Sequence, residues 1–259
     1  MSGPFLLAQL SDLHVGADWG AGDPLAQLAA AVAAAAALRP DAVVVTGDVA
    51  EHGSAAEYEQ AREALAAFAA PVHVLAGNHD RRAELRRALG LPGAGDEPVQ
   101  HAVDLGPLRL VALDTTLPGE DRGELDEPRL AWLDAALAAA PDVPTVVAMH
   151  HAPVWTGVRA LDELGLPAAH RRALAAVVER HPQVRRLVAG HVHRTIAAGI
   201  GGRPLLVAPS TYLQARLDFR TDELELVPEP GGFAVHALHD GEIASHVQPV
   251  RPSTSPRCR

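Results

Sequence analysis

The chain has 259 residues, of which 48% are hydrophobic and 21% charged, a globular composition that excludes disorder over most of its length. Its formal net charge of -10 gives no general attraction for a polyanion, so we expect no duplex nucleic acid partner. The single cysteine, Cys258, excludes an internal disulfide and fits a cytoplasmic protein. We expect one domain over residues 1–250, no signal peptide, and a disordered tail over 251–259.

Along the chain, short apolar runs typical of strands alternate with longer segments rich in good helix formers. The expected elements are strand 5–10, helix 24–38, strand 42–46, helix 55–69, strand 72–76, helix 81–89, strand 108–113, helix 128–139, strand 143–149, helix 168–180 and strand 184–189. This alternation predicts an α/β fold with a largely parallel sheet and helices outside it. The uncharged run 24–38 is too short to span a bilayer, so no membrane span is expected.

The pattern changes from about Thr195 onward. Residues 199–203 are typical of a hairpin turn, and the short segments that follow have no helices between them. These segments lie near Leu205, Ala215, Phe233 and Ala244. We therefore expect the second half of the chain to add antiparallel strands.

Polar motifs follow five of the expected strands. They are Asp12-Leu13-His14, Gly47-Asp48-Val49-Ala50-Glu51, Gly77-Asn78-His79-Asp80, His150-His151-Ala152-Pro153 and Gly190-His191-Val192-His193. Loops at the carboxyl ends of strands form the binding crevice of open α/β sheets, so these motifs should converge on one site. Imidazole and carboxylate groups without a nearby thiolate favour zinc, iron or manganese.

Seven of these residues are candidate metal ligands: Asp12, His14, Asp48, Asn78, His150, His191 and His193. Seven ligands are too many for one tetrahedral ion and suit two divalent ions bridged by Asp48. Two ions about 3.5–4 Å apart can acidify a water molecule, and the metal hydroxide then attacks phosphorus in line with the leaving group. His79, beside them, is the candidate catalytic residue that stabilises charge or protonates the leaving oxygen.

Together, in this order, the five motifs resemble those of the calcineurin-like metallophosphoesterase superfamily, over residues 5 to about 239. The resemblance implies a four-layer α/β/β/α sandwich with a mixed, largely parallel sheet and a second mixed sheet. It implies one ion held by Asp12, His14, Asp48 and His193, and a second held by Asp48, Asn78, His150 and His191. It also implies that His79 acts in catalysis.

Residues 47–58, the run His150-His151-Ala152-Pro153 and the run Pro209-Ser210-Thr211 are similar to the cyclic-nucleotide and glycerophosphodiester phosphodiesterases of that superfamily. Leu161 stands where that branch often has Met, which leaves the metal site untouched. The resemblance implies a small phosphodiester substrate, first a 3',5'-cyclic nucleotide, and a homodimer. A glycerophosphodiesterase, a phosphomonoesterase or nuclease on the same metal core, and a non-catalytic protein-binding scaffold are the alternatives. The acidic balance disfavours the nuclease, and retention of His79 with a full ligand set disfavours the scaffold.

Other roles remain open for several residues near these motifs. Asp12, Asp48 and Asn78 could each be only a turn residue or a helix N-cap. His151 could touch substrate or orient His150, and Asp80 could bond a histidine or begin the following helix.

Three further groups are weighed against structural roles. Packing is favoured over a base pocket for Trp155, Tyr212 and Gln214. The arginine pairs 81–82 and 86–87 are interpreted as a solvated helix face paired with Glu84, without a function. Histidines outside the motifs are interpreted as surface or packing residues: His52, His73, His101, His170, His181, His236, His239 and His246.

Overall fold

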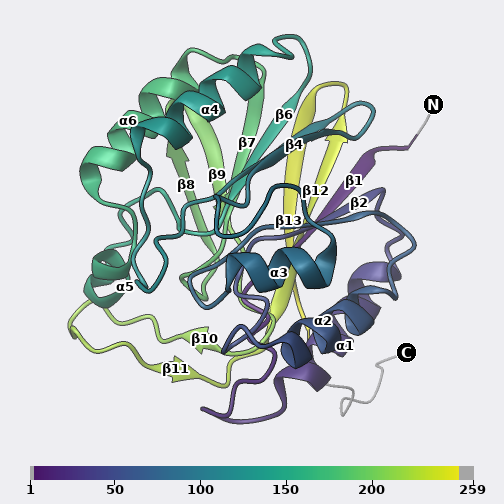
Figure 1. The fold of residues 1–259 in the computed structure, drawn as a ribbon, viewed down its shortest axis with the longest axis vertical. Helices are drawn as coiled ribbons and strands as arrows, with labels where there is room; N and C mark the ends of the chain where they lie inside the picture. Colours follow the sequence, from purple (N-terminus) through teal and green to yellow (C-terminus); the bar gives the residue numbers. More distant parts are fainter. Residues whose placement is uncertain (1–2, 251–259) are drawn as a thin grey trace.

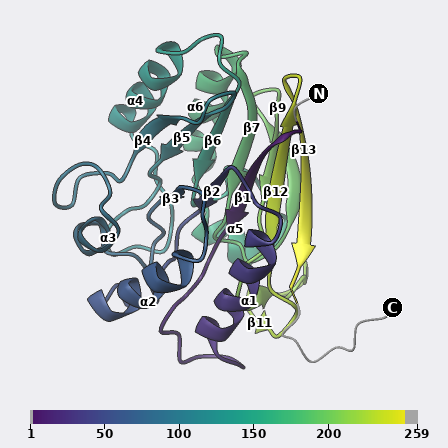
Figure 2. The same ribbon diagram turned by 90° about the vertical axis from the view of Figure 1, so that its right-hand side faces the viewer.

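A computed structural model describes residues 3–250, so the predicted tail 251–259 lies outside the described residues. Two sheets pack face to face and helices cover their outer faces (Figure 1, Figure 2). The sandwich expected from the family resemblance is thereby confirmed.

The first sheet is mixed and has the strand order β13-β12-β1-β2-β3. Its strands are β1 (Phe5–Leu10), β2 (Ala42–Val45), β3 (Val72–Val74), β12 (Gly232–His239) and β13 (Glu242–Pro249). The parallel strands β1, β2 and β3 come from the part of the chain in which strands and helices were expected to alternate. The β12–β13 hairpin extends the sheet, with β12 paired antiparallel to β1.

The second sheet has the order β4-β5-β6-β7-β9-β8, with β5, β6, β7 and β9 parallel and an antiparallel strand at each edge. Its strands are β4 (His101–Asp104), β5 (Arg109–Leu113), β6 (Thr145–Met149), β7 (Val184–Ala189), β8 (Ile196–Ile200) and β9 (Arg203–Val207). A separate two-stranded ribbon joins β10 (Gln214–Ala215) to β11 (Leu226–Val227). The expected turn in 199–203 connects β8 to β9, whereas β4, β8 and β11 were not predicted.

Three apolar clusters account for the layers, because each sheet face needs its own covering. Leu28 of the first helix packs with Tyr58 and Phe233 on the outer face of the first sheet. Leu133 packs with Leu174 and Val147 on the outer face of the second sheet. The third cluster, which includes Leu7, Val44, Leu110 and Val188, lies between the two sheets.

Six helices are present in residues 3–250: α1 (Pro24–Ala36), α2 (Ala55–Leu65), α3 (Arg82–Leu89), α4 (Glu127–Ala138), α5 (Arg159–Leu164) and α6 (Ala168–Glu179). All but α5 match a predicted helix within a few residues. Side chains of Asp23, Ser54 and Asp126 cap α1, α2 and α4 by accepting backbone N–H bonds. The N-cap positions of α3, α5 and α6 are occupied by Arg81, Val158 and Pro167. None of the proposed ligands therefore caps a described helix. None of the described helices is both long and apolar enough to cross a bilayer.

The predicted solvated arginine face of α3 is wrong for two of its members. Arg87 pairs with Glu84 at the surface as expected. Arg82 is buried and pairs with the Asp114 carboxylate at 2.9 Å, while buried Arg86 donates to three backbone carbonyls. These contacts tie α3 to the neighbouring loops. Burial of the two guanidinium groups is tolerated because their acceptors offset the cost of desolvation.

Candidate metal centre

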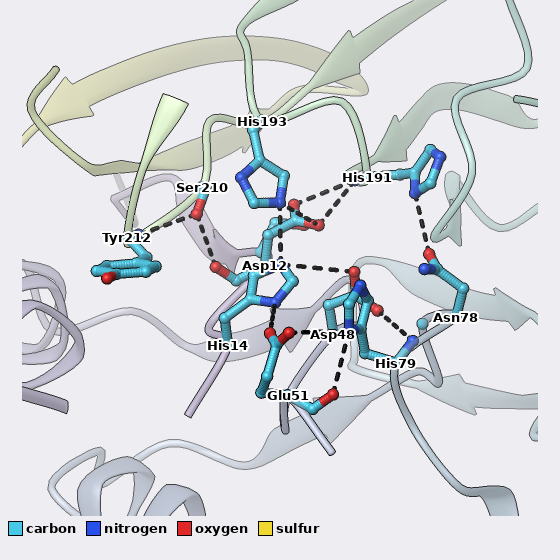
Figure 3. Close-up of polar contacts among 12 residues, drawn as sticks. Asp12, His14, Asp48, Glu51, Asn78, His79, His191, His193, Ser210 and Tyr212 are labelled. Atoms are coloured by element: carbon cyan, nitrogen blue, oxygen red, sulfur yellow. Dashed lines mark hydrogen bonds and ion pairs between the residues drawn. The ribbon is translucent and has the colours of Figure 1, made fainter. Parts of the chain in front are cut away.

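The five polar motifs meet at one edge of the sandwich, as the strand-end positions predicted. Each motif follows the carboxyl end of a parallel strand, namely β1, β2, β3, β6 or β7. Because these strands belong to two facing sheets, their loops enter the site from both sides (Figure 3). All seven candidate ligands therefore lie in one cluster.

The backbone of this cluster is unusual. Seven non-glycine residues in 3–250 have positive φ, and five of them are candidate ligands: Asp12, His14, Asp48, His191 and His193. Such conformations carry a local energetic cost and concentrate at functional sites. Close approach also explains two glycines, since an added Cβ would lie 2.1 Å from Asp48 Oδ1 at Gly77 and 1.9 Å from Ser11 Oγ at Gly190.

One half of the cluster brings two imidazoles together over two carboxylates. His14 Nε2 and His193 Nε2 lie 2.9 Å apart. Asp12 Oδ1 is 3.7 Å from His193 Nε2, and Asp48 Oδ2 is 3.6 Å from His14 Nε2. All four residues are buried and offer ligand atoms within 4.8 Å of one another.

The other half is built around Asn78. Its Oδ1 lies 2.9 Å from His150 Nε2 and 3.0 Å from His191 Nδ1. Asp48 Oδ2 is 3.4 Å from the same His150 nitrogen. Asp48 consequently touches both halves of the cluster.

The opposite ring nitrogens show why these atoms face one another. His150 Nδ1 donates to Thr46 O at 2.8 Å, and His193 Nδ1 donates to Leu213 O at 2.9 Å. His14 Nδ1 bonds the Glu51 carboxylate at 2.7 Å, and His191 Nε2 donates to the Leu164 carbonyl at 3.1 Å. A neutral imidazole that donates through one nitrogen presents a lone pair at the other.

The consequence is that, when all four rings are neutral, lone pairs converge without a donor between them. His14 and His193 direct lone pairs at each other, and His150 and His191 direct theirs at the Asn78 carbonyl oxygen. Such an arrangement is repulsive unless a proton or a metal ion lies among the atoms. Burial lowers the pKa of His150, but the Asp48 carboxylate outweighs it and raises that pKa to about 9, so without a metal ion a proton lies between these two side chains. The donor set therefore fits divalent metal ions, with each histidine oriented by an outer hydrogen bond.

Electrostatics at Asp48 and His79 reflect the same crowding. Burial opposes ionisation of Asp48, but His150, His14 and His79 outweigh it and hold the pKa of Asp48 well below its usual value. His79 donates its backbone N–H to Asp48 Oδ1 at 3.0 Å and its Nδ1–H to the Glu51 carbonyl at 3.1 Å. Burial lowers the pKa of His79, but the Asp48 and Glu51 charges more than compensate and raise it.

The two open alternatives for Asp80 are both wrong. Its carboxylate accepts backbone N–H bonds from Gly77 at 2.9 Å, Ala50 at 3.1 Å and Val49 at 3.2 Å. Its carboxylate therefore joins the loops that carry Asp48 and Asn78, and its hydrogen bonds go neither to a histidine nor to the first turn of α3.

His151 is fully buried behind His150. Its Nδ1 accepts from the Thr115 hydroxyl at 2.9 Å and its Nε2 donates to Asp121 O at 3.1 Å, so both nitrogens are occupied. Burial and the neighbouring His150 lower the pKa of His151 to about 3, which keeps the ring neutral. We assign it to packing against the ligand histidines rather than to metal binding.

The packing interpretation holds for two of the three aromatic and amide candidates. Buried Tyr212 donates its hydroxyl to Trp19 O at 2.8 Å, and buried Gln214 donates to Ser210 O at 2.9 Å. Trp155 is 75% exposed and does not line the cavity above the cluster, so core packing is wrong for it, whereas packing at an interface stays a prediction.

Sequence reasoning missed two residues of the site. Glu51 bonds His14 and accepts the Trp19 indole N–H at 2.6 Å, which places both side chains. The signal available was an acidic residue three positions after Asp48, within the same motif. Trp19 carried no local signal, because its loop position says nothing of what it faces.

A cavity of about 240 Å³ opens above the cluster. Its floor includes His14, Asp48, Asn78 and His79, and its far side is apolar. The candidate metal ligands are thus reachable by a small molecule.

Comparison with known proteins agrees with this geometry. The family model of calcineurin-like phosphoesterases matches residues 5–195. The chain is 34% identical over 254 residues to a 3',5'-cyclic adenosine monophosphate phosphodiesterase of Pseudomonas aeruginosa, covering 95% of this chain and 90% of that protein. It is 38% identical over 181 residues to a glycerophosphodiester phosphodiesterase of Enterobacter lignolyticus, covering 68% of this chain and 64% of that protein.

The fold is also found in a solved structure. A dimetal phosphatase from Danio rerio superposes with a TM-score of 0.71 at 18% identity, covering 96% of this chain and all of that one. Similarity over most of the chain and the matching family model lead to one conclusion: this chain belongs to the calcineurin-like phosphoesterase family.

Proposed function

We propose that this protein is a dinuclear-metal phosphodiesterase that hydrolyses a small phosphodiester, first among them a 3',5'-cyclic nucleotide. The observation that carries the proposal is the pair of converging lone-pair sets that share Asp48 at the floor of one cavity. Similarity to a cyclic adenosine monophosphate phosphodiesterase over nearly the whole chain supports the choice of substrate.

In this proposal Asp12, His14, Asp48 and His193 hold one ion. Asp48, Asn78, His150 and His191 hold the second, and manganese, iron or zinc suits the nitrogen and oxygen donors. When bound, the ions supply a nucleophile at neutral pH and Lewis acidity toward a phosphoryl oxygen.

The chain's own residues orient the reactants and move the proton. His79 is held by its backbone N–H and by Nδ1, and its ring lines the cavity with the side chain 32% exposed. Its Nε2 is the atom left to donate a proton to the leaving-group oxygen. Asp80 joins the loops of Asp48 and Asn78 through three backbone hydrogen bonds, which helps to position the floor of the cavity before substrate binds.

The experiment is hydrolysis by metal-stripped protein of bis(p-nitrophenyl) phosphate, p-nitrophenyl phosphate and 3',5'-cyclic AMP, after titration with manganese, zinc or iron(II). We expect metal-restored turnover that favours the two diesters. Preference for the monoester would replace the proposal with a phosphomonoesterase. No turnover with any metal would favour the non-catalytic scaffold.

A glycerophosphodiester is the second candidate substrate, favoured by 38% identity to the Enterobacter lignolyticus enzyme. Glycerophosphocholine belongs in the same assay, and a higher kcat/KM than for 3',5'-cyclic AMP would select it. A homodimer, the exclusion of duplex nucleic acid and a cytoplasmic location stay predictions.

A further inference from the structure

The cavity above the metal-site residues has a second wall that the hydrolytic chemistry does not use. This apolar wall is contributed by α5, by the ribbon β10–β11 with its connecting segment, and by the loop between β7 and β8. We define it by six side chains: Leu161, Leu164, Val192, Ala215, Leu224 and Leu226. Trp19 lines the same cavity near His14, its ring centroid 5.3 Å from that imidazole. A ligand bound at the floor therefore extends against hydrocarbon and an aromatic ring.

The two elements of the wall are connected to each other. The Arg159 guanidinium on α5 pairs with the Asp222 carboxylate in the segment between β10 and β11 at 2.7 Å. Phe219 of that segment lies against Gly157, where an added Cβ would be 3.3 Å from its ring. In Figure 1, α5 lies beside the outer end of this ribbon. This ion pair and the Phe219 contact hold the two elements of the wall against each other.

The charge of the cavity restricts what can bind there. Among residues 3–250 its lining includes no lysine or arginine, and outside the metal-site residues its one charged side chain is the exposed Asp121. An anionic or strongly polar substituent would find no partner on this wall and would be repelled by that carboxylate. A flat, uncharged, largely apolar substituent would instead cover it.

Leu224 gives a second reason to expect a flat, apolar substituent on this wall. Its side chain lines the cavity and is 43% exposed. Exposing a leucine to water does not stabilise the free protein, whereas burying it under a ligand is favourable. A planar ring seated on the wall would remove Leu224, Leu226 and Leu164 from water together. Aromatic bases fit this requirement because every base has an apolar face, whatever its edge carries.

We propose that the apolar wall, together with Trp19, is a nucleobase subsite that selects nucleotide diesters over diesters of glycerol or other small alcohols. The inference rests on the proposed function, since it places the phosphate of the same molecule over the metal-site residues. The wall is also hydrogen-bonded to the metal-site residues, because the Leu164 carbonyl accepts the Nε2–H of His191.

The test compares two diesters that differ only in the base: 3',5'-cyclic AMP and the 3',5'-cyclic phosphate of 1-deoxyribose. The variant is Leu224→Asn, and the matched control is Leu217→Asn in the same segment, which is 56% exposed and does not line the cavity. In the wild type we expect kcat/KM to favour 3',5'-cyclic AMP by about tenfold or more. Leu224→Asn should shrink this preference about threefold or more, through KM, with the base-free diester and the control unchanged.

A binding measurement without turnover separates the subsite from catalysis. Adenosine, which has no phosphodiester to hydrolyse, is titrated into the metal-loaded protein by calorimetry, with D-ribose as the ligand without a base. Adenosine should bind, ribose should not, and Leu224→Asn should weaken adenosine about threefold or more, while Leu217→Asn should not. Equal kcat/KM for the two cyclic diesters in the wild type, or equal effects of the two variants, would overturn the subsite while leaving phosphodiesterase activity intact. Absence of all diester hydrolysis would instead defeat the proposed function, and adenosine binding would still decide the subsite.

Discussion

Glu51 offers the most direct test of how the metal centre is held together. Its carboxylate accepts the His14 Nδ1–H at 2.7 Å and the Trp19 indole N–H at 2.6 Å, and its side chain is nearly buried. Burial alone would raise the pKa of Glu51, but these two hydrogen bonds and the nearby histidines lower it, so the group is ionised at neutral pH. Glu51→Ala removes the acceptor that points His14 Nε2 into the cluster.

The expected cost follows from the part that His14 plays. Loss of a group that orients a ligand histidine typically weakens metal binding 10- to 100-fold, which is about 1.4 to 2.7 kcal/mol. Glu51→Gln keeps one oxygen acceptor without the charge, so we expect it to fall between the wild type and Glu51→Ala. Glu59→Ala is the control, since Glu59 is exposed and bonds only Arg62.

The assay is competition for zinc or manganese between metal-stripped protein and a chromophoric chelator, with circular dichroism to verify folding. We expect one of the two binding events to weaken in Glu51→Ala and the other to keep its affinity within about threefold. Wild-type affinity for both ions in the folded variant would refute the role given to Glu51.

Three further predictions concern the floor of the site and the core. Asp48→Ala should cost metal content and activity together, because its carboxylate touches both halves of the cluster, and elemental analysis beside the diester assay measures this. His79→Ala should keep near wild-type metal content but lose about 100- to 10,000-fold in turnover of a diester with a poor leaving group; full activity would remove His79 from the mechanism. His236, fully buried between Gln9 and Ser245, has its pKa lowered to about 3 by burial and by Arg186. Since the unfolded chain then binds the extra proton below pH ~6.5, stability falls as pH drops, and His236→Gln should reduce the loss of unfolding free energy between pH 7.5 and 5 by about 2 kcal/mol in urea titrations. An unchanged loss would show that His236 titrates normally in the fold.

Much of this protein can be predicted from the chain alone, because the informative patterns are local. The alternation of apolar runs with Ala- and Leu-rich segments predicts six of the seven parallel strands and five of the six helices described. The exception is β9, which was expected among the antiparallel strands but pairs in parallel with β7 and antiparallel with β8. Motifs such as Gly47-Asp48 and Gly190-His191 mark strand ends, and strand ends converge in any α/β sheet. The seven candidate ligands and His79 can therefore be selected without coordinates.

Tertiary structure alone decided what depends on contacts between distant residues. Periodicity predicted one largely parallel sheet and could not divide the strands into two, because the partner of β1 is β12, with Phe5 opposite Leu238. The burial of Arg82 and Arg86 depended on acceptors that the helix pattern does not contain. The same holds for Glu51, for the backbone amides that Asp80 binds, and for the nitrogen that each histidine turns to the metal site. Residue type and spacing determine which groups can reach the site, whereas packing across the two sheets determines which of their atoms face it.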